Sequence, residues 1–575
     1  MRYSISYNNP ATQFIHIKTE VDFLDHDKKQ LQLSIWRPGR YERGDFAQYV
    51  ADFTVTDLNG QKIGWKKKSS ALWEIHTDER KVNISYRFHA GILNAGSTWV
   101  DAHQLYVNPI NCLMFIPGKE NEPCILKLTL PENYVVATSM KESPKHTFHV
   151  PDFHTLADSP FIASDRLKHY QFDYKDIPFH FWFSGECRPN WKRIQKDTEA
   201  IIKKQWQTME NFPTDQYHVL CHVLPHHAYH GVEHTSSTVF TLGPSHELME
   251  PSLYNEFLGI FSHELFHVWN VKTIRPADFF PYDYSKENYS ELGYVYEGIT
   301  TYYGDLFALS SQVFSWDFFA GLLNDWITKY YHNYGRKVYS VAQSSFDTWI
   351  DGYKPGIPNR KVNIYNEGAL CALMADLTII HNSSGKFSLD DVARKLNHEF
   401  GLLKKGYTRD HYKAILEEYA GTDMDDFFCS FVEGTDDYGR LLFPLLETIG
   451  LGTYTKENTS LSARDYGFKI RQEGNRHMVA AIAPNSPAEN AGMMLNDEIR
   501  TVNGINISND LDKWLHYFSA EDRIELTVSG ATGIRRIFII RMNKTFYPSY
   551  VVLKKENASL EEKEAFKKWS GNNFD

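Results

Sequence analysis

The sequence has none of the features that direct a chain into a membrane, along the usual export route or onto nucleic acid. The segment Met1–Pro10 has no apolar core of the kind that a signal peptide needs. No apolar run in the 575 residues is long enough to cross a bilayer. The formal net charge of −11 argues against nucleic acid as a partner. We therefore expect a cytoplasmic protein without a membrane span, and export without a recognisable signal stays open.

Cysteine is scarce, and neither internal repeats nor low-complexity segments occur. The six cysteines show no paired spacing and are expected to be reduced and structural: Cys112, Cys124, Cys187, Cys221, Cys371 and Cys429. Hydrophobic residues make up 42% and aromatic residues 15% of the chain, which is enough for several cores. A length of 575 residues predicts two to four domains.

The patterning predicts a multidomain α+β protein. Short alternating runs separated by turn residues indicate an N-terminal all-β, β-sandwich-like domain over residues 1–165. Residues 166–452 read as mainly helical, and residues 453–545 as a β-rich domain. Residues 546–575 form a charged amphipathic tail that is expected to be helical and to dock Phe566 and Trp569 on the protein body.

A His-Glu-x-x-His motif lies in the apolar segment Pro251–Asn270, which has helical spacing. On a helix, His263 and His267 lie one turn apart on the same face. Two buried histidines and a glutamate need a partner that offsets their desolvation, and a metal supplies it. Two imidazole nitrogens at this spacing predict a Zn²⁺ site, with Glu264 as the base beside a bound water.

A third metal ligand is expected in the next apolar segment, Leu292–Gly304, which also reads as a helix. Its inner face carries one carboxylate, Glu297, and a lone buried glutamate is costly unless it is paired or metal-bound. Two histidines and one glutamate leave the fourth coordination position for water, as in catalytic zinc sites. We predict one zinc ion per chain.

These motifs resemble those of the glycyl aminopeptidase family, zinc peptidases that belong with thermolysin and aminopeptidase N and use Glu as the third ligand. The segment Trp36–Tyr41 is similar to part of that family's β domain, although its arginines are expected to be solvated. The spacing of 30 positions between His267 and Glu297 fits this family rather than aminopeptidase N, which has a shorter gap. The resemblance implies a thermolysin-like catalytic domain and cleavage after small N-terminal residues, Gly or Ala.

The resemblance also implies a binding site for the substrate's free amine. The segment Gly231-Val-Glu-His is similar to the element whose glutamate binds the α-amino group in these enzymes, which points to Glu233 and Gly231. The alternative is a strand-end glutamate that faces solvent. Four nearby histidines permit a second metal site, but we favour a loop-to-strand segment that borders the active site: His226, His227, His230 and His234.

A further catalytic residue is implied at Tyr365. The segment Ile364–Leu370 resembles one whose tyrosine donates to the tetrahedral oxyanion. Glu367 replaces the lysine of that pattern, so the match is partial, and a core tyrosine is the alternative.

The region after Gly452 resembles a PDZ domain. Tyr466, Gly467 and Phe468 correspond to the loop that holds a peptide's C-terminal carboxylate in such domains. A module that only packs against the rest of the protein is equally compatible with the sequence.

The leading hypothesis is a zinc aminopeptidase acting on peptides with a free N-terminus. A zinc endopeptidase or oligopeptidase is the first alternative. A non-catalytic peptide-binding scaffold, working through the PDZ-like domain, is the second, although a scaffold has no use for Glu264. The oligomeric state is unknown from the sequence.

Overall fold

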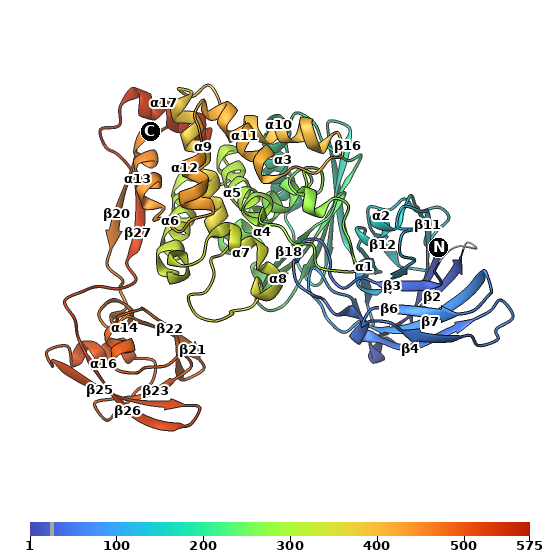
Figure 1. Ribbon diagram of the computed structural model, residues 1–575, viewed down its shortest axis with the longest axis horizontal. Helices are drawn as coiled ribbons and strands as arrows, with labels where there is room; N and C mark the ends of the chain where they lie inside the picture. The colour runs from blue at the N-terminus through green and yellow to red at the C-terminus, as the bar shows by residue number, and fades with distance from the viewer. Residues whose placement is uncertain (24–27, 575) are drawn as a thin grey trace. The chain divides into compact units, whose positions relative to one another are not determined.

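The computed structural model describes residues 1–23 and 28–574 (Figure 1). The chain divides into two compact units. The first unit comprises Met1–Phe314, Ser345–Tyr353 and Leu389–Tyr419. The second unit comprises Ser315–Ser344, Lys354–Ser388 and Ala420–Asp575.

Three antiparallel or mixed sheets build the N-terminal part of the first unit. The largest has the order β13-β11-β1-β2-β7-β4, and the other two are β10-β3-β6-β5 and β12-β14-β9-β8. Strands β2 (Phe14–Asp22) and β7 (Lys81–His89) alternate buried and more exposed side chains, as expected for a sheet with one face on the core. The remaining strands are β1 (Arg2–Ser6), β3 (Gln30–Leu33), β4 (Val50–Thr56), β5 (Gly64–Lys67), β6 (Leu72–His76), β8 (Trp99–Val100), β9 (Gln104–Val107), β10 (Met114–Phe115), β11 (Cys124–Thr129), β12 (Val135–Ala137), β13 (Thr147–Val150) and β14 (Phe161–Ser164).

A five-stranded sheet with the order β15-β16-β17-β19-β18 follows in the same unit. The strands are β15 (Lys168–Tyr174), β16 (Ile177–Ser184), β17 (Tyr217–Val223), β18 (Ala228–Glu233) and β19 (Ser237–Gly243). Strands β16, β17 and β19 are parallel, whereas β18 pairs antiparallel at the edge. The prediction of a mainly helical region from residue 166 was therefore wrong at its start. Strand β19 is buried along its whole length, so its apolar run lacks the alternation that marks a strand.

Helices pack beside this sheet and carry the metal motif. They include α3 (Trp191–Met209), α4 (Pro251–Phe266), α5 (Thr300–Ser310), α10 (Leu389–Leu396) and α11 (Arg409–Ala420). Pro251 occupies the first turn of α4, where its missing N–H costs nothing. The helix was predicted to reach Asn270 but ends at Phe266, with His267 as its C-cap. The predicted helix around Glu297 is present, and its first part, Tyr294–Ile299, is wound as a π-helix, a form that recurs at functional sites.

The second unit holds further helices and a two-stranded ribbon. The helices include α6 (Trp316–His332), α9 (Asn366–Asn382), α13 (Gly439–Thr448) and α17 (Leu560–Ser570), and the ribbon pairs β20 (Leu451–Lys456) with β27 (Ser549–Lys554). The tail helix α17 starts with a complete capping box between Ser559 and Glu562. Phe566 and Trp569 are buried on α6, as predicted. The tail is not helical throughout, because it also contributes β27.

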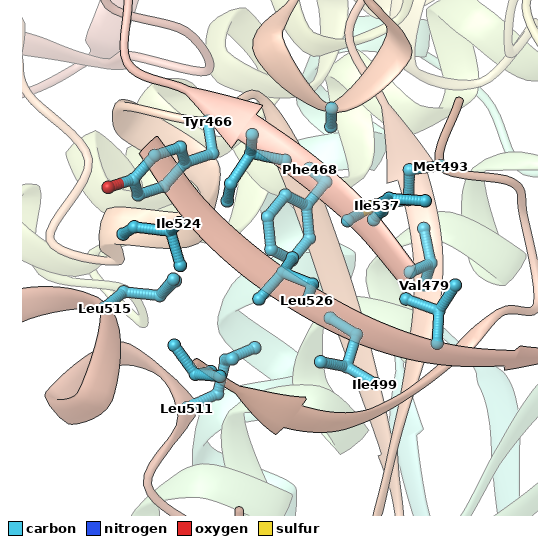
Figure 2. Packing of buried hydrophobic residues seen from close by; sticks show 14 residues of the cluster. Tyr466, Phe468, Val479, Met493, Ile499, Leu511, Leu515, Ile524, Leu526 and Ile537 are labelled. Carbon is cyan, nitrogen blue, oxygen red and sulfur yellow. The ribbon is translucent and has the colours of Figure 1, made fainter. Parts of the chain in front are cut away.

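The β-rich region of the second unit has its own hydrophobic core (Figure 2). Its sheet runs β21-β22-β23-β25-β26, and β24 (Ile505–Asn506) pairs with β23. The other elements are β21 (Phe468–Glu473), β22 (Arg476–Ile482), α15 (Pro487–Asn490), β23 (Glu498–Val502), α16 (Leu511–Tyr517), β25 (Arg523–Gly530) and β26 (Gly533–Ile540). Phe468 of β21 and Leu515 of α16 belong to this core. The assignment as a PDZ domain remains a prediction.

Two expectations about the whole chain can be compared with the structure. All six cysteines are free thiols, and all except Cys429 are buried. Among the described residues, none of the helices combines the length and the apolar character needed to span a membrane.

Candidate active site

The two helices that carry the metal motif lie in close contact. A Cβ atom at Gly304 of α5 would lie 3.1 Å from the Cα atom of His263 in α4, so glycine permits this approach. The contact places Glu297, just before α5, beside the two histidines.

The three predicted metal ligands converge. The Nε2 atoms of His263 and His267 are 3.1 Å apart. The Oε2 atom of Glu297 lies 3.8 Å from the first of these nitrogens and 3.4 Å from the second. Ligand atoms bonded at 2.0–2.1 Å to a tetrahedral zinc ion are ~3.3 Å apart, so the donor set and its spacing fit this ion.

Hydrogen bonds behind His267 fix its orientation. Its Nδ1 atom lies 2.6 Å from the carbonyl oxygen of Asn270, which can only accept, so Nδ1 carries the proton and Nε2 keeps a lone pair for the metal. The side-chain amide of Asn270 in turn donates to the Val295 carbonyl and the Thr300 hydroxyl. These bonds tie the end of α4 to the π-helical segment that carries the third ligand.

The edge strand β18 supplies the wall opposite the metal helix. A Cβ atom at Gly231 would lie only 2.2 Å from Oε1 of Glu264, so the strand approaches the predicted base as closely as a backbone can. The other oxygen of this buried glutamate, Oε2, has no hydrogen-bond partner among the described residues. Glu264 therefore has one oxygen against the backbone of β18 and the other available for proton transfer.

Glu233 at the end of β18 points into the same site. It is only 3% exposed, which excludes the solvent-facing alternative. One of its carboxylate oxygens lies within 4.8 Å of ligand atoms of Glu264 and His267. Its Oε1 atom has no hydrogen-bond partner in the described part of the chain. A buried carboxylate with a free acceptor is suited to bind a cation such as a peptide's α-ammonium group.

Burial and crowding shift the pKa values of these groups. Burial raises the pKa of Glu264 well above its ordinary value, and it also raises that of Glu297. Burial lowers the pKa of His263. For His267, burial acts in the same direction, but the neighbouring Glu297 outweighs it and raises the pKa to about 9. A divalent cation among these groups would favour ionised carboxylates and neutral imidazoles, as metal ligation requires.

A network of polar groups that the sequence did not indicate supports the end of β18. Asp158 accepts hydrogen bonds from His234 Nδ1 at 3.0 Å, from Lys272 Nζ at 2.8 Å and from the backbone and hydroxyl of Thr235. Although burial alone would raise it, Lys272 and His234 hold the pKa of Asp158 well below its usual value. Because His234 directly follows Glu233, this network fixes the backbone that carries Glu233.

We expected the arginines of the segment Trp36–Tyr41 to be solvated, and the structure shows that this is wrong for Arg37. Arg37 is buried, and Trp36 anchors the turn by donating from Nε1 to the Asp283 carbonyl at 2.8 Å. Gly39 has a φ of +82°, and a Cβ atom there would lie 2.3 Å from Oε2 of Glu233. The positive φ and the close approach both require glycine at this position, and the turn closes over Glu233.

Other predicted site residues lie elsewhere in the chain. Tyr365 belongs to the second unit, at the N-cap of α9, and its role remains a prediction. The predicted carboxylate loop at Tyr466, Gly467 and Phe468 is in that unit too, with the Gly467 N–H donating to the Ala463 carbonyl. Among the residues that the structure describes, none of the four histidines of the cluster belongs to a metal-ligating group: His226, His227, His230 and His234.

Two models of one peptidase family match segments of the chain. The chain matches the model of the Peptidase M61 N-terminal domain over residues 2–165 and the model of the M61 glycyl aminopeptidase over residues 256–371. The predicted resemblance to glycyl aminopeptidases is thus confirmed. A search of curated proteins found no match.

Two similar solved structures differ in how closely they match. A crystal structure of an aminopeptidase N family protein from Idiomarina loihiensis covers 99% of each chain at 25% sequence identity, with a TM-score of 0.91. An M1 zinc metallopeptidase from Deinococcus radiodurans is a more distant match, with 13% identity and a TM-score of 0.48 over 76% of this chain and 93% of that one.

Proposed function

We propose that this chain, a metallopeptidase related to the M61 glycyl aminopeptidases, is a zinc-dependent aminopeptidase that releases small N-terminal residues, Gly or Ala, from peptides. The observation that carries this proposal is the buried Glu233, whose free Oε1 lies beside the base and the metal ligands. The preference for Gly or Ala rests on the family resemblance.

The ligands His263, His267 and Glu297 would hold the zinc ion. When bound, zinc lowers the pKa of a water ligand to about 7 and polarises a carbonyl group. Glu264 then takes the proton of the attacking water at its unpaired Oε2 and passes it to the leaving amine. The raised pKa of Glu264 brings it nearer to the value that such a proton shuttle needs.

Glu233 defines which bond is cleaved. Its carboxylate binds the α-ammonium group, so that the first peptide bond reaches the metal and internal positions of a longer chain are excluded. We assign Tyr365 as the donor to the oxyanion on the strength of the motif alone. The PDZ-like domain is proposed either to bind a peptide C-terminus or to pack without a ligand.

The test compares a glycyl peptide with its N-acetylated twin, using zinc-loaded full-length protein. We expect hydrolysis of the free peptide alone. In Glu233→Gln, kcat/KM for the free peptide should fall about 10- to 100-fold, because a hydrogen bond to a charged group is lost. The matched control is Glu247→Gln, whose side chain is half-exposed and outside the site. Equal hydrolysis of both peptides would identify an endopeptidase, and hydrolysis of neither would favour the scaffold.

A further inference from the structure

Arg37 is a buried cation with very few partners. It is 5% exposed, and within the described residues its guanidinium donates one hydrogen bond, to the Pro38 carbonyl, and forms no ion pair. A buried charge with so little compensation is costly unless an anion joins it. Among the described residues no carboxylate forms an ion pair with Arg37, and the nearby Glu233 compensates its charge only from a distance.

Arg37 lines a cavity of about 260 Å³ in the first unit. Two other arginines line it but are already paired, Arg40 with Glu42, and Arg43 with Asp45 and Glu287. Arg37 is therefore the cation of this cavity that remains available for an anion.

Uncharged polar groups in the same cavity also lack partners. Thr98 and Asn111 line it and are buried, and neither the Thr98 hydroxyl nor the Asn111 Oδ1 atom has a hydrogen-bond partner among the described residues. The guanidinium lies flat on Gly96, where a Cβ atom would be 2.1 Å from Arg37 Nη2. A planar cation held in place beside a hydroxyl donor matches the geometry of a carboxylate.

This cation lies next to the strand that carries the amine-binding glutamate. Only Pro38 separates Arg37 from Gly39, whose backbone touches Glu233. The charge of Arg37 interacts with Glu233 and His230 of β18. Burial, together with the positive charges of Arg37 and Arg40, lowers the pKa of His230 to about 3.

We propose that Arg37 forms a carboxylate-binding subsite beside the amine anchor, and that the substrates are di- and tripeptides whose free C-terminal carboxylate reaches it. This proposal rests on the aminopeptidase function and specifies its substrate class. Glu233 would bind the N-terminal ammonium group of a short peptide and Arg37 its C-terminal carboxylate. The distance between these two opposite charges would then select substrates by their length.

The experiment measures binding, so it does not depend on turnover. Calorimetry on zinc-loaded, full-length Glu264→Gln protein compares Gly-Leu, Gly-Leu-amide and N-acetyl-leucine. We expect Gly-Leu to bind about 10- to 100-fold more tightly than its amide, as for other charge-assisted hydrogen bonds. Adding Arg37→Gln should abolish this difference, whereas Arg43→Gln, which changes an already paired arginine, should preserve it.

A second variant tests whether the effect of Arg37→Gln comes from the lost guanidinium or from a disturbed fold. Gly96→Ala leaves Arg37 in the chain but displaces its guanidinium, and should weaken Gly-Leu binding without weakening that of the amide. If N-acetyl-leucine binds in an Arg37-dependent way while Gly-Leu and its amide bind equally, the carboxylate site is real but the short-peptide class is wrong. If no ligand shows Arg37-dependent binding of its carboxylate, the proposal is overturned. Absence of hydrolysis by the wild-type protein would refute the aminopeptidase function without deciding this point.

Discussion

Replacing Gly231 by alanine tests how closely the edge strand positions the catalytic base. The new Cβ atom would lie 2.2 Å from Oε1 and 2.8 Å from Cδ of Glu264, and 2.8 Å from Cδ1 of Ile260. Contacts under 3.0 Å are essentially never seen for a real Cβ atom, so the carboxylate must move by at least 3.0 − 2.2 = 0.8 Å. A displacement of about 1 Å in a catalytic group costs roughly 100-fold in rate.

We therefore expect kcat of Gly231→Ala to fall about 100-fold, while the zinc content stays at the wild-type level because the three ligands are untouched. Steady-state kinetics on a glycyl peptide and metal analysis measure the two quantities. The control is Gly64→Ala in β5, where the nearest atom to the new Cβ is 3.9 Å away. A kcat for Gly231→Ala close to that of the control would refute the close approach of β18 to the base.

Three further predictions follow from buried charges. Glu264→Gln should lower kcat by about 100-fold or more while keeping bound zinc, because only the proton acceptor is lost; retention of activity would remove Glu264 from the mechanism. Asp158→Asn should destabilise the fold by about 3 to 5 kcal/mol in denaturant unfolding, because it leaves the buried Lys272 unpaired; a change below 1 kcal/mol would contradict the ion pair. Burial raises the pKa of Glu367 in the folded protein to about 8, so its carboxyl group ionises at a lower pH in the unfolded chain than in the folded one. The free energy of unfolding therefore falls by about 1.4 kcal/mol per pH unit as the pH rises from the ordinary pKa of 4.5 to 8. Glu367→Gln should thus gain stability over the wild type at pH 8 but not at pH 4, and parallel pH profiles would refute this.

The convergence of the three candidate metal ligands was predictable because its signal is local. His263, Glu264 and His267 lie within one helical turn, and Glu297 is a single carboxylate in an apolar segment, so spacing and burial identify them. The helix end at Phe266 was not predictable in this way. It depends on hydrogen bonds of Asn270 to Val295 and Thr300, which join segments far apart in the sequence.

The residues that support the site could not be predicted either, because their partners lie far away in the sequence. Asp158 lies at the end of a short helix with no motif around it, and its partner Lys272 is more than 100 positions away. Arg37 was read as solvated because a turn rich in proline and glycine is usually exposed, whereas here the turn closes over Glu233. Strand β19 was not predicted because burial on both faces removes the alternating pattern.

The most direct test of the central claim is the mass-spectrometric product pattern of a tripeptide with an N-terminal glycine, incubated with zinc-loaded protein. We expect free glycine and the corresponding dipeptide to appear together, and chelation of zinc to stop the reaction. Release of the C-terminal residue as the first product, or cleavage that persists after zinc removal and in Glu264→Gln, would contradict the proposed function.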